Sequence, residues 1–539
     1  MTTIINNARR RFMVQSGLGL LALSGMPSFL QAMEAMKEMP RIPARKANPN
    51  FKANVEFDLY CKPNKVSILT GAKTQVLQYS ALLKKGPKET LVNIPGTYLG
   101  PIIHLQKGQK VRINLHNGLT ESSVTHWHGL HVPAEMDGHP MYAIDPGGTL
   151  VYEFEVLNRA GMNIYHPHPH EATAKQVYQG LAGALFVHDE EEAKLELPTG
   201  EYEIPIVIQD RLFDEQNQLI YVRNKHDRMM GFYGDRILVN GQADVKIDVA
   251  SRAYRLRILN GSNARIYKLA WDDGTSITVI GVDGGLLEQP EVKAYVMLAP
   301  GERLDVWADF SGRRVGSELI LRSLAFSGVL PRMSQGMGNM MQANSLPVAS
   351  DYPIFTIRVT QSVSDSPKLP AKLSSFPRYH TKDVANPEKP VPIAISESPM
   401  AMLLNGRAYA DNDFQEFERI KLNTLQLIEI FHAHGGMGMG HKGGGMGMMG
   451  GMMSMAHPIH LHGQQFQIIS RSVNSEKASD YETVRHGFIE SGLKDTVLVM
   501  PGESVRIIKP FQDFKGVFMY HCHNLEHEDM GMMREFLVE

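Results

Sequence analysis

The sequence predicts an all-β fold made of three related domains. Short alternating or β-branched runs recur along the chain, as at residues 55–60, 150–156, 276–280 and 517–521. Runs of this length and composition are typical of strands in a β-sandwich or barrel. Glycine turns precede several of these runs, and one turn-and-strand unit recurs three times. The chain of 539 residues is long enough for two to four domains of ordinary size.

The repeated unit is a glycine turn followed by an alternating strand. It occurs at residues 107–113, 300–306 and 501–507. The copies are similarly spaced, which indicates a threefold internal repeat. A second turn, an apolar residue followed by Asn-Gly, occurs at residues 239–241 and 404–406, upstream of the second and third copies. Together these turns favour three homologous domains over chance recurrence.

Two changes in composition mark the expected domain boundaries. An acidic run covers residues 189–192, and a segment rich in proline and serine covers about residues 362–392. We therefore expect an N-terminal signal and tail at residues 1–45 and domains at residues 46–195, 196–362 and 363–539. Within the third domain, residues 435–455 consist almost entirely of glycine and methionine. Such a segment cannot form a core, so we expect a mobile loop there.

The charge and the N-terminus bear on partners and on location. A formal net charge of -2 gives no global electrostatic reason to expect nucleic acid or an anionic membrane as partner. Residues 8–13 read Ala-Arg-Arg-Arg-Phe-Met and precede a short apolar run, as in a twin-arginine export signal. We expect a periplasmic protein without membrane insertion, its mature form beginning after Ala32. The alternative is a basic tail on a cytoplasmic protein.

The two cysteines, Cys61 and Cys522, lie far apart in sequence. At most one disulfide can form, so disulfides cannot be what holds the fold together. For Cys61 we expect a buried, inert thiol.

Histidines are concentrated in His-x-His segments. The chain has 22 histidines, for which independent placement gives about one such pair. The segments lie at residues 126–128, 166–170, 432–434, 460–462 and 521–523. In an extended strand, residues i and i+2 point to the same face, so each pair presents two imidazoles side by side. Four such pairs are enough to enclose a cluster of metal ions.

The His-Cys-His segment at residues 521–523 indicates two metal sites at once. In a strand, both imidazoles point one way and the Cys522 thiolate points the other way. His527 and Met532 follow closely, and His457 precedes the pair at residues 460–462. A thiolate, two imidazoles and a thioether are the donors of a blue-copper electron-transfer site with a weak axial methionine.

These segments resemble the four copper-binding motifs of the multicopper oxidase family. The motifs are His-Trp-His-Gly at 126–129, His-Pro-His at 166–168, His-Pro-Ile-His-Leu-His-Gly at 457–463, and His-Cys-His-Asn-Leu-Glu-His at 521–527 with Met532. All four occur in the family's order and spacing, and repeats and motifs together span about residues 50–539. The resemblance implies three cupredoxin domains, each a Greek-key β-barrel, and four copper ions.

The resemblance also implies a ligand set. The type 1 copper falls to His457, Cys522, His527 and Met532. The type 2 copper falls to His126 and His460, and the type 3 pair to His128, His166, His168, His462, His521 and His523. Asp137 and Glu528 stand where the family keeps proton-relay carboxylates, which can also orient ligand imidazoles. The alternative, that both only fix loops, stays open.

The positions of the paired histidines have a geometric consequence. The cluster histidines come only from residues 126–168 and 460–523, so the first and third domains must meet around the metals. The middle domain has no such pair and is expected to be a spacer and scaffold. Cys522 and its neighbours then link the type 1 site covalently to the cluster, where dioxygen is reduced.

The methionine-rich segment bears on the substrate. Its thioether and imidazole donors suit Cu(I), and it directly precedes His457. The candidate substrate-copper ligands are Met437, Met439, His441, Met446, Met448, Met449, Met452, Met453 and Met455. The segment resembles those of periplasmic cuprous oxidases, although the residue four before His457 is Met453 and not an acid. The alternative is a low-complexity linker.

Several functions are compatible with these sequence features. The first is a monomeric cuprous oxidase in copper tolerance that also oxidises phenols or Fe(II), and the second is a general laccase. A third is an exported copper-sequestering protein with a vestigial oxidase centre. Three repeats and eight cluster histidines argue against a two-domain copper nitrite reductase.

Overall fold

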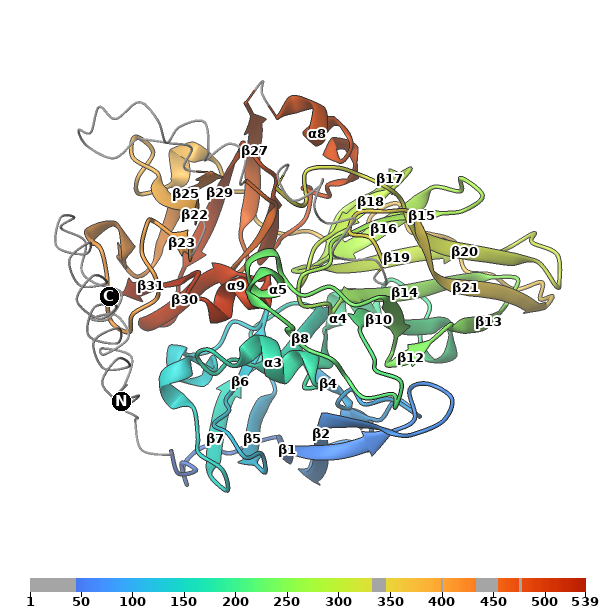
Figure 1. The fold of residues 1–539 in the computed structure, drawn as a ribbon, viewed down its shortest axis with the longest axis horizontal. Helices are drawn as coiled ribbons and strands as arrows, with labels where there is room; N and C mark the ends of the chain where they lie inside the picture. The colour runs from blue at the N-terminus through green and yellow to red at the C-terminus, as the bar shows by residue number, and fades with distance from the viewer. Residues whose placement is uncertain (1–44, 332–345, 399–400, 433–453, 475–476) are drawn as a thin grey trace, which may run out of the picture. The chain divides into compact units, whose positions relative to one another are not determined.

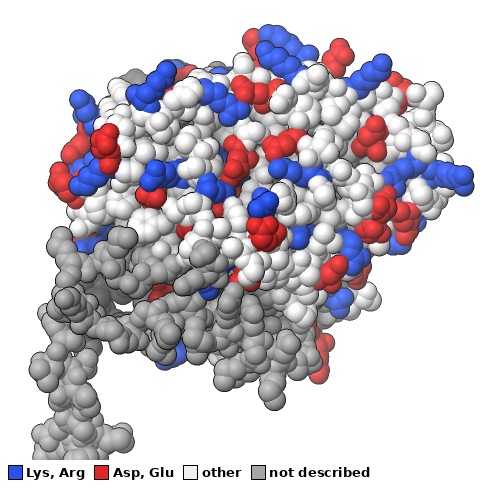
Figure 2. All heavy atoms as spheres, turned by 90° about the horizontal axis from the view of Figure 1, so that it is seen from above, with Lys and Arg blue, Asp and Glu red and all other residues white. Residues whose placement is uncertain are grey.

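The computed structural model describes residues 45–331, 346–398, 401–432, 454–474 and 477–539. The predicted export signal, with its arginines and apolar run, lies outside these residues. Among the described residues, no helix is long and apolar enough to cross a membrane. On the face drawn in Figure 2, acidic and basic side chains of these residues are interspersed, as the small net charge would lead one to expect.

The prediction of an all-β fold is confirmed. The strands of the described residues form six sheets, two in each third of the chain, and Figure 1 shows the thirds in blue to cyan, green to yellow, and orange to red. The sheets fall inside the three expected ranges, although the domain limits themselves stay a prediction.

The first third forms a four-stranded and a five-stranded sheet, ordered β2-β1-β5-β7 and β3-β4-β9-β8-β6. Its strands are β1 (Val55–Val66), β2 (Thr74–Lys85), β3 (Leu91–Val92), β4 (Ile102–Gln106), β5 (Lys110–Asn117), β6 (Thr125–His128), β7 (Thr149–Glu155), β8 (Gly161–Pro167) and β9 (Gly183–His188). Alternation fits a sandwich: in β5, every second residue from Val111 is buried.

The middle third forms a seven-stranded and a five-stranded sheet, ordered β12-β11-β10-β14-β19-β16-β17 and β13-β21-β20-β15-β18. Its strands are β10 (Glu203–Arg211), β11 (Arg236–Val239), β12 (Gln242–Ala243), β13 (Lys246–Ala250), β14 (Ala253–Asn260), β15 (Tyr267–Trp271), β16 (Ile277–Val282), β17 (Gly285–Lys293), β18 (Val296–Leu298), β19 (Arg303–Asp309), β20 (Glu318–Ser323) and β21 (Tyr352–Gln361).

The last third forms two five-stranded sheets, ordered β23-β22-β25-β29-β27 and β24-β31-β30-β26-β28. Its strands are β22 (Val391–Ser398), β23 (Ala401–Leu404), β24 (Arg419–Ile420), β25 (Thr424–His432), β26 (His457–Leu461), β27 (Gln467–Val473), β28 (Thr496–Val499), β29 (Glu503–Phe511), β30 (Gly516–Cys522) and β31 (Met533–Val538).

One pairing pattern occurs in all three thirds and confirms the threefold repeat. The first long strand pairs in parallel with a second strand, which pairs antiparallel with a third. The three sets are β1-β5-β7, β10-β14-β19 and β22-β25-β29. Two parallel strands must be joined by a long connection. The strands of each repeat are therefore not neighbours in sequence, as they would be in a series of hairpins.

The segment predicted to be the first copy of the repeat is the wrong one. Residues 107–113 lead into β5, which corresponds to β14 and β25, whereas the other two predicted copies lead into β19 and β29. The true counterpart is the Pro146-Gly147 turn, which leads into β7. Glycine turns before strands occur more than once in each repeat, so sequence spacing alone selected the wrong one.

The two Asn-Gly turns are structurally equivalent, as predicted. Asn240 and Asn405 have φ values of 51° and 54°, which asparagine tolerates better than most residues. Each carboxamide oxygen accepts a 2.8 Å hydrogen bond from a neighbouring strand, from the N–H of Val207 and of Ala394 respectively.

Each third has its own apolar core, and further clusters join the thirds. One cluster packs Ile164 and Phe186 of the first third against Val207 and Leu238 of the middle third. Another packs middle-third residues such as Met297 with residues near β28. The middle third therefore contacts both of its neighbours.

Short helices lie between the strands and near the ends of the sheets. They are α3 (Thr173–Tyr178), α4 (Glu190–Ala193), α5 (Lys225–Met230), α8 (Ala478–Glu482) and α9 (Leu525–Asp529). Helix α9, in red in Figure 1, contacts both α3 and α5, so it touches the first and the middle third.

Both cysteines are buried free thiols, so they form no disulfide with each other. Burial raises the pKa of the Cys61 thiol to about 12, and Tyr79 opposes part of that rise. The expectation of a buried thiol at this position is confirmed.

Candidate metal centre

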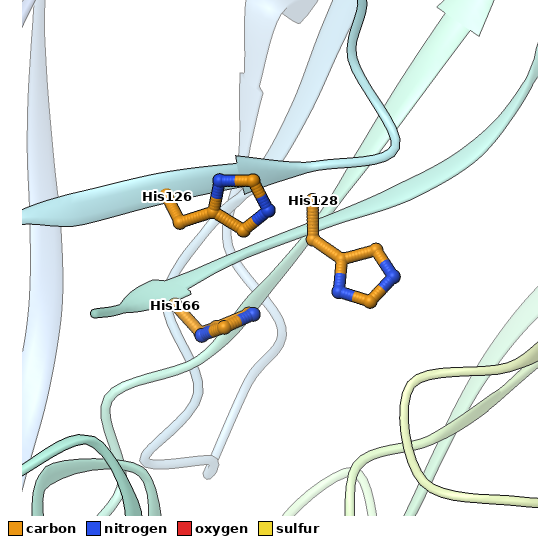
Figure 3. Close-up of side chains that lie close together, drawn as sticks. All are labelled: His126, His128 and His166. Atoms are coloured by element: carbon orange, nitrogen blue, oxygen red, sulfur yellow. The ribbon is translucent and has the colours of Figure 1, made fainter. Parts of the chain in front are cut away.

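Two strand pairs bring the predicted cluster histidines together. In the first third, β6 pairs with β8 so that His126 lies opposite His166. In the last third, β26 pairs with β30 so that His460 lies opposite His521. Figure 3 shows the rings of His126 and His166, together with that of His128, close together on the two neighbouring strands of the first third.

The two strand pairs face each other, as the distribution of histidines required. The rings of His126 and His462 are stacked with centroids 3.8 Å apart, and those of His128 and His460 are stacked at 3.7 Å. Each stack joins the first third to the last. All eight predicted cluster histidines are buried.

Several ring nitrogens in this cluster have no hydrogen-bond partner among the described residues. They are Nε2 of His126, His166 and His460, Nδ1 of His128 and His168, and both ring nitrogens of His523. Leaving one such buried polar atom unpaired costs about 1–3 kcal/mol. So many in one place indicates that they bind something other than protein.

Other nitrogens of the cluster point at each other. Nε2 of His521 lies 3.2 Å from Nε2 of His462 and 3.3 Å from Nε2 of His168. A ring nitrogen of a neutral imidazole carries either one hydrogen or one lone pair, so Nε2 of His521 cannot form a good hydrogen bond with both neighbours. A shared metal ion accounts for the convergence, and the ligand atoms of this trio lie within 4.8 Å of one another.

The opposite ring nitrogens are held by the protein. Nδ1 of His126 donates to the Asp137 carbonyl at 2.5 Å, and Nδ1 of His460 donates to the Asp495 carbonyl at 2.9 Å. Nδ1 of His462 lies 2.7 Å from Asp137 Oδ2. Such bonds fix the tautomer, so that the lone pair faces the cluster.

The electrostatics also suit metal ligands. Burial lowers the pKa of His126 and His462 well below its usual range, with neighbouring histidines adding to the effect. The pKa of His166 falls to about 4 and that of His168 to about 3, again mainly through burial. These imidazoles are neutral at pH 7, which is the form that binds metals.

A second group lies on the other face of β30. Nδ1 of His457 is 3.4 Å from the Cys522 sulfur, and Nδ1 of His527 is 3.7 Å from it. All three residues are fully buried. Cys522 therefore lies between two sites, because His521 and His523 point into the histidine cluster.

Met532 belongs to the same buried core cluster as Cys522. Its backbone carbonyl accepts a 3.0 Å hydrogen bond from the Cys522 N–H, which fixes the two residues side by side. Burial raises the pKa of the Cys522 thiol, so deprotonation requires a strong local positive charge such as a metal ion.

A carboxylate that belongs to no recognisable sequence motif contacts this second group. Glu397 Oε1 accepts a 2.9 Å hydrogen bond from His457 Nε2 and a 2.7 Å bond from the Met455 N–H. His432 lies 3.8 Å from its other oxygen. Although burial alone would raise the pKa of Glu397, these two histidines hold it well below its usual range.

The two predicted proton-relay carboxyls both lie at the cluster but differ in ionisation. Burial raises the pKa of Asp137 well above its usual range, with Lys509 opposing the rise. Burial would also raise the pKa of Glu528, but His521 and His168 lower it below its usual range. Glu528 lies 3.0 Å from His521 Nδ1. One neutral and one ionised carboxyl group can act as proton donor and acceptor.

The middle third reaches the cluster, so its predicted role as a spacer is incomplete. It supplies no histidine, but Arg303 binds Asp495, and Asp495 binds His128. Asp495 and Arg303 are far apart in sequence and neither lies in a copper-binding motif, so nothing in the sequence connected them to the cluster.

Most of the predicted substrate-copper ligands lie outside the described residues. These are Met437, Met439, His441, Met446, Met448, Met449, Met452 and Met453. Met455 is described and is buried against the core of the last third. Its neighbour Ala456 donates a backbone hydrogen bond to Val329.

Comparisons with known proteins agree with this site. Residues 76–192 and 447–539 match models of multicopper oxidase domains. A multicopper oxidase of Staphylococcus aureus is 31% identical over 456 residues, which cover 84% of this chain and 85% of that protein.

Solved structures agree as well. A variant of the multicopper oxidase McoA of Aquifex aeolicus has 31% sequence identity and a TM-score of 0.74, covering 91% of this chain and 97% of that one. The Campylobacter jejuni multicopper oxidase, described as a metallo-oxidase, has 28% identity and a TM-score of 0.69, covering 93% and 96%.

The fold and the site define a copper-dependent oxidoreductase with cupredoxin-like domains. This chain belongs to the multicopper oxidase family, whose members couple oxidation of a reducing substrate to reduction of dioxygen.

Proposed function

We propose that this protein oxidises Cu(I) and passes the electrons through four bound coppers to dioxygen. The observation that supports the proposal best is the group of buried, unpartnered imidazole nitrogens beside a strand that also carries a buried thiol. Donors of this kind, imidazole with thiolate, are suited to copper.

The proposed ligands follow the two groups of side chains. For the type 1 ion they are His457, Cys522, His527 and Met532. For the type 2 ion they are His126 and His460, and for the type 3 pair His128, His166, His168, His462, His521 and His523. Bound copper would supply one-electron acceptance from substrate at the first ion and four-electron reduction of dioxygen at the other three.

The protein's own residues then have defined tasks. His521, Cys522 and His523 connect the two sites through one short piece of backbone. Asp137, whose buried carboxyl group holds a proton, would donate it near the cluster. Glu528, held ionised beside His521, would accept and return protons or keep that imidazole oriented.

Cu(I) is the proposed physiological substrate. The methionine-rich segment offers soft donors directly before His457. Met455, at its end, donates its N–H to Glu397, which in turn contacts His457. The Campylobacter jejuni relative, described as a metallo-oxidase, supports a metal ion as substrate.

Two further proposals concern the setting of the reaction. The arginine-rich N-terminus supports export through the twin-arginine route to the periplasm. Oxidation of Cu(I) there would contribute to copper tolerance, and we expect the enzyme to act as a monomer.

The test of substrate is oxygen consumption with Cu(I) and with a phenol, before and after removal of residues 435–452. The deletion stops short of Met455, so the contact with Glu397 is kept. We expect the rate with Cu(I) to fall at least about tenfold, the effect of losing about 1.4 kcal/mol of substrate interaction, while the phenol rate is unchanged. Its matched control replaces the same residues with a glycine-serine segment of equal length.

The alternatives give different results in the same experiment. A general laccase would oxidise the phenol rapidly and lose nothing with Cu(I) on deletion. A sequestering protein would bind more than four coppers per chain and consume no oxygen with either donor. Metal content with visible and EPR spectra of the wild type decides between enzyme and storage protein.

A further inference from the structure

Arg303 and Asp495 form a buried ion pair between the middle and the last third. Arg303 Nη1 lies 2.7 Å from Asp495 Oδ1, and Nη2 lies 2.5 Å from Oδ2. Both side chains are at most 1% exposed. The guanidinium therefore binds the carboxylate through two parallel hydrogen bonds, a geometry that lysine cannot reproduce.

The same carboxylate contacts the histidine cluster. His128 Nε2 donates to Asp495 Oδ1 at 3.0 Å, which leaves His128 Nδ1 without a partner and facing the cluster. The Asp495 backbone carbonyl accepts from His460 Nδ1 at 2.9 Å. Thr496 completes the group by donating its hydroxyl to Asp495 Oδ1 at 2.9 Å. One residue thus orients one imidazole from the first third and one from the last.

Arg303 is itself rigidly held. Its Nε donates to the Met162 carbonyl at 2.9 Å, and its Nη2 donates to the Asp283 carbonyl at 3.0 Å. Its Nη1 also donates to the Gly301 carbonyl at 2.9 Å. The contact with Met162 ties this arginine to β8, the strand that carries His166.

Two glycines show how closely the backbone approaches this contact. A Cβ added to Gly129, the residue after His128, would lie 2.7 Å from Arg303 Nη2 and 3.0 Å from Asp495 Oδ2. A Cβ added to Gly301 would lie 3.0 Å from the ring of His523. The middle third is therefore packed against the histidine cluster with no room for another atom.

We propose that Arg303 is a positioning residue for the proposed copper cluster: it fixes Asp495, which aims His128 and His460 at the metals. The middle third thereby takes part in building a site to which it gives no ligand. This inference rests on the proposed assignment of these histidines to type 2 and type 3 copper.

The physical reason is that His128 can rotate about its side-chain bonds unless its outer nitrogen is bound. Removal of partners that orient a metal-binding histidine typically weakens metal affinity about 10- to 100-fold. If Arg303 is replaced, Asp495 loses both parallel bonds and is free to turn away from His128. Type 1 donors all come from the last third and do not contact Arg303, so their site is expected to persist.

The experiment compares Arg303→Lys and Arg303→Met with Arg255→Lys. Arg255 is an equally buried arginine of the middle third that binds Asp305 and Glu192, so it reports general damage from losing a buried guanidinium. Each full-length protein is loaded with copper and titrated with a chelator. The readouts are copper per chain, the type 2 EPR signal and the visible band of the Cys522 site.

We expect both Arg303 variants to release type 2 and type 3 copper at about 10- to 100-fold lower chelator concentration than the wild type. The visible band should remain, which also shows that the last third is folded. Arg255→Lys should behave as the wild type. If Arg303→Met does not fold, Arg303→Lys still answers the question, because it keeps the charge and loses only the paired geometry.

Three outcomes would overturn the inference. The first is unchanged copper retention in Arg303→Lys, and the second is equal copper loss in Arg255→Lys. The third is parallel loss of the visible band and of the cluster copper. Failure of the proposed function looks different, because the wild type itself would then bind no type 2 or type 3 copper.

Discussion

Glu397 determines the charge next to His457 without being a donor in the proposed type 1 site. Its carboxylate accepts a hydrogen bond from the Nε2–H of His457, so the lone pair at Nδ1 faces the Cys522 sulfur. His527 is oriented differently, because its Nε2 lies 3.1 Å from the neutral carbonyl of Met229. The two imidazoles of the site therefore have unequal electrostatic surroundings.

We predict that Glu397→Gln raises the reduction potential of the type 1 copper. The amide oxygen still accepts from His457, but the negative charge that favours the oxidised ion is gone. The expected shift corresponds to about 1.5–3 kcal/mol, the range for hydrogen bonds to charged groups. Redox titration of the visible band measures it.

Glu429→Gln on β25 is the control for this change. Glu429 binds Ser504 and Arg506 on the neighbouring strand, so its replacement alters the net charge equally without touching His457. An equal shift in both variants, or no shift in Glu397→Gln, would refute a local role for Glu397.

We predict that Glu528→Gln slows dioxygen reduction while the visible band of the Cys522 site is retained. The amide fills the same space but cannot take up a proton, and general acid–base catalysis typically contributes a factor of about 100 or more. Stopped-flow reoxidation of the reduced enzyme measures the step directly. Glu526→Gln on the same helix is the control, because Glu526 bonds to Tyr221 and Asn263 instead of facing the cluster. Turnover as fast as in the wild type would rule the role out.

At the scale of elements, the period of the strand explains why the metal motifs could be recognised. His521 and Cys522 are the last residues of β30 and point to opposite faces, and His523, directly after the strand, lies on the side of His521, as alternation requires. The Asn-Gly turns could also be predicted from sequence, because few residue types accept the positive φ that these turns require. Such local rules do not choose among several glycine turns, which is why the first copy of the repeat was aligned to β5 when β7 was correct.

We predict that Asn405→Ala lowers the free energy of unfolding by about 1–3 kcal/mol. The carboxamide of Asn405 accepts from the Ala394 N–H and donates to the Tyr520 hydroxyl at 3.0 Å, so its loss leaves the half-buried Ala394 N–H without its acceptor and the Tyr520 hydroxyl without this donor. Chemical denaturation followed by fluorescence measures the change.

The variant Asn423→Ala separates the two causes of that loss, which are the missing side-chain hydrogen bonds and the strain of an alanine at positive φ. Asn423 also has a positive φ, 61°, but lies exposed in a turn before β25. The difference between the two variants gives the contribution of the Asn405 hydrogen bonds. Equal losses would mean that backbone strain alone accounts for the effect.

At the scale of the molecule, the site lies where the first and last thirds meet and the middle third closes one side. Ring stacks such as His126 with His462 join segments that are hundreds of residues apart. Imidazoles held neutral by burial do not attract one another strongly. Bound metal would therefore act as a cross-link between the two thirds.

We predict that removal of all bound copper lowers the unfolding temperature more than loss of the type 1 ion alone does. Ligand present at about 1,000 times its Kd stabilises the folded state by roughly 4 kcal/mol. Calorimetry of the copper-free wild type and of copper-loaded Cys522→Ser compares the two. Cys522→Ser should lose less, because all donors of the type 1 site come from one third. An equally low unfolding temperature for both proteins would contradict the cross-link.

Strand alternation and short motifs are local patterns that decide the chemistry of each segment, so they were sufficient to predict the all-β fold, the family and the histidines that lie together. Only the tertiary structure revealed that Glu397 binds His457, and that Arg303 binds Asp495, which in turn binds His128. Those contacts join residues that are distant in sequence. Which residues meet depends on how the sheets of different thirds pack together, and no local sequence pattern contains that information.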